Sequence, residues 1–140
     1  MARVRRRASV VVGCVAACAL VVSATGCTSV EVRPADVIGT WHGPNGGAIT
    51  VFSDGRAIFS DFPRVAAGGD GAGVVSGAAK WYIDPEVPHE YIEFVGTKMT
   101  SSAFNHKGWT GNVVFGRSQM YFWTADPSEN KKYTVTRSSR

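Results

Sequence analysis

Few residues of this chain combine the types and the spacing that chemistry requires. The chain has three histidines, His42, His89 and His106. Their spacing matches no local zinc-binding signature. The letters of Ser128 to Lys131 match an S-x-x-K nucleophile motif, but the accompanying motifs are absent and the segment reads as a hairpin turn. Glu90 and Glu93 point to opposite faces of a predicted strand, so they cannot form an acid–base pair. We therefore predict no catalytic residue, no metal site and no cofactor, and expect that the protein is not an enzyme.

One cysteine is a candidate for modification. Arginines at positions 3 and 5–7 precede an apolar run over residues 8–22, and small residues at 23–26 lead into Cys27. This order is typical of a secretory signal peptide. Its ending resembles the lipobox of bacterial lipoproteins, in which the thiol is acylated and the chain is cut just before the cysteine. The resemblance implies a signal peptide over residues 1–26 and a lipidated Cys27.

The leader also predicts where the protein works. We expect a domain held by lipid on the extracellular face of the cell membrane, with residues 27–36 as a short tether that contains Pro34. Two acyl chains anchor stably, whereas one holds only marginally. The apolar run of about 15–18 residues lies just below the roughly 20 of a spanning helix, so an uncleaved anchor stays an alternative. Export by the general secretory route or by the twin-arginine route is also left open.

The charge of the chain argues against nucleic acid as a partner. The sequence carries fifteen Lys and Arg against eleven Asp and Glu, a formal net charge of +4. Four of the basic residues precede Cys27 and all the acidic residues follow it, so the mature chain is formally neutral. A nucleic-acid-binding face needs clustered basic residues, and the only compact basic group here is Lys131 with Lys132.

The mature chain must fold on its apolar core. Only Cys27 remains after removal of the leader, so no internal disulfide can form. All fifteen aromatic residues (four Trp, four Tyr and seven Phe) lie beyond Cys27, and each large ring removes about 150–250 Å² from water when it is buried. We predict that residues 37–140 form a single domain.

Short β-branched and aromatic runs alternate with Gly, Pro, Asn and Asp, which favours strands over helices. The predicted strands span residues 38–42, 48–52, 56–62, 78–84, 90–95, 109–115, 119–125 and 132–137. Residues 65–77, with six glycines, are expected to form a loop with at most a weak strand near Val74. Seven or eight strands with hairpin-length connections predict an all-β antiparallel meander, closed into a small up-and-down barrel. A two-sheet β-sandwich is the alternative.

Two resemblances add to this reading. Gly39-Thr40-Trp41 in the first strand resembles the G-x-W of lipocalin-type barrels, whose Trp closes the barrel base and packs against an Arg near the chain end. That likeness implies a cation–π contact between Trp41 and Arg137, contributing about 0.5–2 kcal/mol. Most of the mature chain is also similar to small secreted lipoproteins of high-GC Gram-positive bacteria, a likeness that implies no assigned activity.

Aromatic residues supply the candidate binding site. Five rings exceed what a small barrel interior must hold: Trp81, Tyr91, Trp109, Tyr121 and Trp123. They predict a pocket lined by rings, in a protein that binds a small apolar or amphipathic ligand without catalysis. The alternative is a cell-envelope interaction or structural module with a solid core and an exposed aromatic patch. Oligomeric state and the identity of any partner do not follow from the sequence.

Overall fold

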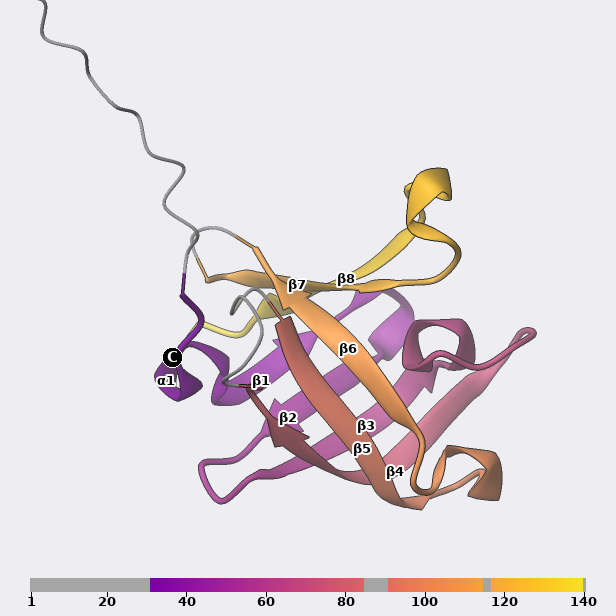
Figure 1. Ribbon diagram of the computed structural model, residues 1–140, viewed down its shortest axis with the longest axis horizontal. Helices are drawn as coiled ribbons and strands as arrows, with labels where there is room; N and C mark the ends of the chain where they lie inside the picture. The colour runs from indigo at the N-terminus through magenta and orange to yellow at the C-terminus, as the bar shows by residue number, and fades with distance from the viewer. Residues whose placement is uncertain (1–30, 85–90, 115–116, 140) are drawn as a thin grey trace, which may run out of the picture.

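Eight antiparallel strands close into a barrel in this protein (Figure 1). The computed structural model describes residues 31–84, 91–114 and 117–139. Each strand pairs with its sequence neighbours, and β1 pairs with β8 to complete the ring. The strands are β1 Gly39–His42, β2 Ala48–Val51, β3 Arg56–Pro63, β4 Val74–Tyr82, β5 Tyr91–Met99, β6 Gly108–Val113, β7 Gln119–Trp123 and β8 Lys132–Arg137. The predicted meander and its closure are confirmed, and the sandwich alternative is wrong.

The two ends of the barrel differ in their connections. Because successive strands run up and down, connections alternate between the ends. One end carries the α1 helix Pro34–Val37, the β2–β3 hairpin and the described C-terminal residues. The opposite end carries four short 3-10 segments, η1 Pro44–Gly46, η2 Arg64–Ala67, η3 Ser102–Phe104 and η4 Pro127–Glu129. Figure 1 shows α1 at the left and these four turns at the right of the barrel.

The interior of the barrel is filled by side chains. Alternate residues of each strand point inward, as the pleat requires. The ring of Phe59 has its centroid 5.0 Å from that of Phe62, 5.2 Å from that of Phe94 and 5.2 Å from that of Trp109. Gly111 also faces inward, and a Cβ there would lie 2.8 Å from the Met120 sulfur. The barrel has no room at that point even for a methyl group.

The first and last strands meet as the lipocalin likeness implies. Trp41 is fully buried, pairs with Arg137 across β1 and β8, and carries the Arg137 guanidinium 5.4 Å from its ring centroid. Its indole N–H donates to the carbonyl oxygen of Val37 at 2.9 Å. Gly39 has φ +140°, and a Cβ there would come within 3.3 Å of Arg137 Nε, so glycine suits both the backbone and the stacked arginine.

Two boundaries differ from those expected. β4 begins at Val74, so the predicted loop over residues 65–77 is too long. The glycines hid a strand with a bulge: Gly77 has φ +138°, and a Cβ there would lie 2.3 Å from the Lys98 carbonyl oxygen. At the N-terminal side, Val32 and Asp36 are buried against the barrel. The folded body therefore starts several residues before position 37, inside the segment expected to be a tether.

Candidate functional site

The structure brings four of the five predicted aromatic residues to one side of the barrel. Tyr91 lies on β5, Trp109 on β6, and Tyr121 and Trp123 on β7. Tyr91 pairs with Asn112, which pairs in turn with Tyr121. These two tyrosines therefore share the outer face, where both are half-buried.

Trp81 is the exception. It is buried on β4, and its indole N–H donates to the carbonyl oxygen of Phe52 at 2.8 Å, near the β2–β3 hairpin. That hairpin lies at the α1 end of the barrel, so Trp81 is separated from the other four rings. Its predicted ligand-binding role is not supported by this position.

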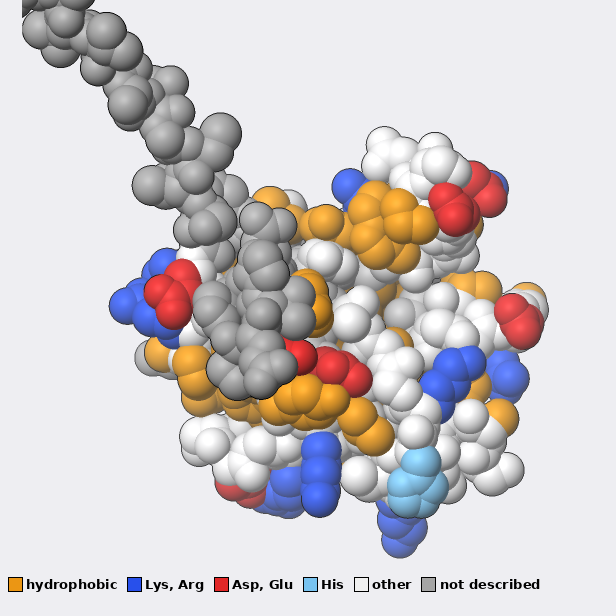
Figure 2. Space-filling model, viewed as in Figure 1, with side chains coloured by type: hydrophobic (Ala, Val, Ile, Leu, Met, Phe, Trp, Pro, Cys, Tyr) orange, Lys and Arg blue, Asp and Glu red, His pale blue; other side chains and the backbone are white. Residues whose placement is uncertain are grey.

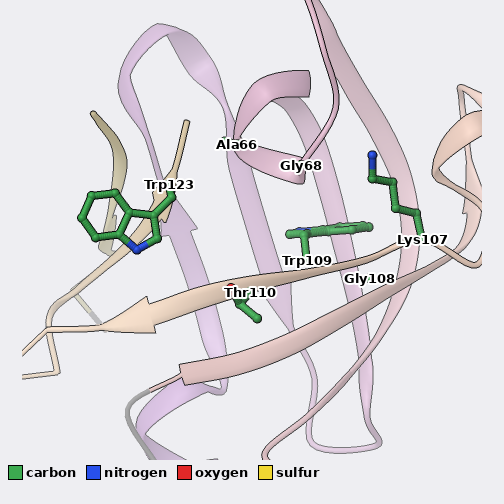
Figure 3. Close-up of a pocket in the computed structure, with 7 residues that line it drawn as sticks. All are labelled: Ala66, Gly68, Lys107, Gly108, Trp109, Thr110 and Trp123. Atoms are coloured by element: carbon green, nitrogen blue, oxygen red, sulfur yellow. The ribbon is translucent and has the colours of Figure 1, made fainter. Parts of the chain in front are cut away.

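A recess opens where β6 and β7 separate. These two strands pair only at Asn112 with Tyr121 and at Val113 with Met120, and diverge toward the η end. The η2 segment packs against both strands across the gap. The resulting cavity, which we call the β6–β7 recess, has a volume of about 190 Å³. Its walls are Ala66, Gly68, Lys107, Gly108, Trp109, Thr110 and Trp123 (Figure 3).

Trp109 brings an unpaired donor to the recess. Its side chain is only 6% exposed, and its indole nitrogen is buried without a hydrogen-bond partner among the described residues. In the view of Figure 3 the nitrogen lies at the end of the indole nearer to Trp123. An unsatisfied buried donor costs roughly 1–3 kcal/mol. By contrast, the indole nitrogens of Trp41 and Trp81 both donate to backbone carbonyls.

Cations stack on the rings at the two sides of the recess. On one side, Lys132 Nζ lies 4.5 Å from the ring centroid of Tyr121 and 4.6 Å from that of Trp123. On the other side, the Phe104 ring holds Lys107 Nζ at 5.5 Å and the Arg64 guanidinium carbon at 5.1 Å from its centroid. Figure 2 shows hydrophobic side chains gathered over the β7–β8 hairpin, beside the turn that joins its strands.

The nearest carboxylate stands on the outer face of β5. Glu93 pairs with Thr110, and a Cβ built at Gly108 would lie 3.2 Å from Glu93 Oε1. A hydrogen bond to Glu93 raises the pKa of the Tyr82 phenol, followed in effect by desolvation and by the charges of Glu93 and Asp84. Glu93 is thus engaged with Tyr82 on its β4 side, away from the recess.

A second charged cluster lies at the α1 end. Asp36 is buried, and its carboxylate contacts Arg117 Nη1 at 3.1 Å and Arg33 Nε at 3.4 Å. Burial by itself would raise the pKa of Asp36. Hydrogen bonds from Arg33 and the charge of Arg117 outweigh it, so the pKa lies below its ordinary value. This cluster joins α1 to the loop before β7 and leaves no free group for chemistry.

The other residues considered for chemistry stay apart in the structure. His42 and His106 are both exposed, and no group of metal-ligating side chains occurs within residues 31–84, 91–114 and 117–139. The S-x-x-K letters fall on the exposed η4 turn. Cys27, His89 and Glu90 lie outside the described residues.

Several residues of the recess escaped the sequence analysis. Ala66 and Gly68 reach it because the segment after β3 folds back over the gap, and nothing in their local sequence reports that contact. Lys107 belongs to a stretch that fitted no pattern, although its position two residues before Trp109 was a usable signal. Lys132 was noted only as part of a basic pair.

Comparison with known proteins identifies no relative. No protein-family model, no curated protein and no solved structure matches the chain. Among the helices of the described part of the chain, none has the length and apolarity needed to cross a bilayer.

Proposed function

We propose that the protein is a non-catalytic binding module of the cell envelope, anchored by lipid at Cys27, which engages its partner at the β6–β7 recess. The observation that carries this proposal is the combination of a filled barrel with a single-group-sized recess on its outside. Ligand pockets for small molecules usually measure about 300–1,000 Å³. A recess of about 190 Å³ suits one side chain or one ring of a larger partner better than a whole amphipathic molecule.

The filled interior favours the interaction module over a lipocalin-like carrier. An eight-stranded barrel holds either side chains or one small ligand. Here the inward positions are occupied by packed rings, with Phe62 4.9 Å from Phe122 and 5.2 Å from Tyr133 between centroids. A ligand inside the barrel would have to displace them. The outer rings at the recess are half-buried, so the binding surface is compact rather than a broad aromatic patch.

The position of the recess supports the same proposal. Gly108 begins β6 and Trp123 ends β7, so the recess lies at the η end of the barrel. α1, which the chain enters from the side of Cys27, lies at the opposite end (Figure 1). A lipid anchor on Cys27 would place α1 toward the membrane and the recess away from it, where a partner could approach.

Site-specific photo-crosslinking in native cells tests this function. Benzoylphenylalanine at position 123 is expected to give a discrete crosslinked product. The same group at position 58 serves as the matched control, because Ile58 is an exposed apolar residue on β3, away from the recess. Equal products from both positions, or no product from position 123, would contradict binding at the recess.

A further inference from the structure

The β6–β7 recess combines a buried donor, nearby cations and apolar walls. We propose that it binds a carboxylate attached to an apolar ring or side chain. This inference rests on the proposed binding function and specifies the chemical group that the recess accepts. It follows from three features of the recess, each independent of the others.

The first feature is the unsatisfied donor. Trp109 is more than nine-tenths buried, and its indole N–H has no acceptor among the described residues. An oxygen of a bound carboxylate would accept this hydrogen bond and remove the cost of the unpaired group. Its nitrogen is covered in the free protein, so access requires a small movement of one wall. Trp123 is the wall most free to move, because it is only half-buried.

The second feature is the charge around the recess. Lys107 lines it, Lys132 lies over the Trp123 ring and Arg64 stands beside Lys107 on Phe104. In the described part of the chain none of these three cations forms an ion pair. Their charges lie near a pocket partly shielded from water, where an anion gains more than it would in bulk solvent.

The third feature is the apolar surface beside the donor. The Trp123 ring and Ala66 offer carbon atoms to the body of a ligand. Glycines at 68 and 108 leave further walls without side chains. A carboxylate attached to a ring or to a large side chain would place its charge near the N–H and the lysines, and its carbon atoms against these walls. A fully polar anion such as sulfate would leave the apolar walls uncovered.

Two sources supply this chemistry: a free small organic acid and the C-terminal residue of a polypeptide. Phenylacetate represents the first source, and the tripeptide Ala-Ala-Phe with a free C-terminus represents the second. Phenylacetamide and the amidated tripeptide are their neutral counterparts. Titration calorimetry with the purified protein measures each dissociation constant at low and at high salt.

We expect at least one acid to bind tenfold or more tightly than its amide, because a charge-assisted hydrogen bond is lost with the carboxylate. Binding should weaken at 1 M salt, where the Debye length falls to about 3 Å. Tighter binding of the tripeptide than of phenylacetate would identify a polypeptide terminus as the source, and the reverse order a free acid. If neither acid binds, or if each amide binds as well as its acid, the inference is overturned.

Variants connect the affinity to the residues. Trp109→Phe keeps a ring and removes the N–H, and should weaken the tighter acid about tenfold. Lys107→Gln and Lys132→Gln should each weaken it roughly twofold to fivefold. Trp81→Phe removes an indole whose N–H is already bonded, and Lys98→Gln removes an exposed lysine outside the recess. Both controls should bind as the unaltered protein does, and equal loss in a variant and its control would refute the assignment.

Failure of this inference and failure of the proposed function give different results. Crosslinks from position 123 without binding of either acid would leave a recess that accepts some other group. Absence of crosslinks together with absence of acid binding would remove both. Circular dichroism of each variant shows whether it is folded, and Trp109→Leu provides a second replacement should Trp109→Phe fail to fold.

Discussion

Arg137 lies over the Trp41 ring, with its guanidinium carbon 5.4 Å from the ring centroid, at the junction where the last strand closes onto the first. The same guanidinium donates to the carbonyl oxygens of Ala35 and Ile38. One side chain thus joins β8, β1 and the segment around α1. In a domain without a disulfide, this contact connects the two ends of the folded chain.

Trp41→Ala should destabilise the domain by about 3–5 kcal/mol, because Trp41 is fully buried and its loss leaves a large cavity. Arg137→Lys keeps the charge but loses the planar stacking and one of the carbonyl contacts, so a smaller loss of about 1–2 kcal/mol is expected. Urea unfolding monitored by circular dichroism measures both. A Trp41→Ala domain that unfolds at the same urea concentration as the parent would show that this junction does not hold the barrel closed.

Acid should weaken the α1 cluster through Asp36. The folded pKa of Asp36 lies below its ordinary value, so the stabilisation is complete at neutral pH and is lost as the pH falls below about 4 and through the folded pKa. Asp36→Asn should lower stability at pH 7 by roughly 1 kcal/mol and flatten this part of the acid limb. Unfolding free energies between pH 2 and pH 7 provide the measurement. Parallel curves for the two proteins would mean that Asp36 contributes nothing through its charge.

Filling of the barrel predicts how the interior responds to truncation. The unaltered protein should show no rise in melting temperature with benzene, because its interior has no vacant volume. Phe59→Ala should lose about 3–5 kcal/mol and gain a dry cavity among Phe62, Phe94 and Trp109, which benzene can enter. Should that variant not fold, Phe59→Leu gives a smaller cavity for the same test. A benzene-induced shift in the unaltered protein would reveal a hollow interior.

Lipidation at Cys27 makes a prediction about location. Cys27→Ser should move the protein from the membrane fraction to the medium or the soluble fraction, because the acyl chains have no attachment site. Cys18→Ser alters a cysteine in the leader and serves as the control, with membrane association retained. Fractionation and intact mass analysis measure the outcome. A Cys27→Ser protein that stays in the membrane would instead point to an uncleaved apolar anchor.

Much of the fold could be predicted because the barrel follows local rules. β8 was predicted with the observed bounds, Lys132–Arg137, because its alternating residues lie between clear turn signals. β4 was cut short, since Gly77 reads as a loop residue and its role in a bulge depends on the approach of Lys98. Strand periodicity is a local property, whereas the bulge arises from contact with a neighbouring strand.

The recess could be predicted only in part, because it forms from segments distant in sequence. Aromatic excess identified Trp109 and Trp123, yet it also selected Trp81, whose indole is bonded to Phe52 elsewhere in the barrel. Whether an inward or outward ring borders a cavity depends on where two strands separate. The divergence of β6 from β7, and the packing of η2 across the gap, are tertiary features.

The most direct test of the account is the position of a bound ligand. Nitrogen–proton NMR of the labelled protein resolves the four indole N–H groups, which can be followed during titration with phenylacetate or Ala-Ala-Phe. The account predicts that the Trp109 and Trp123 signals shift while those of Trp41 and Trp81 stay in place. Shifts at Trp41 and Trp81, or none at any indole, would contradict binding at a recess outside a filled barrel.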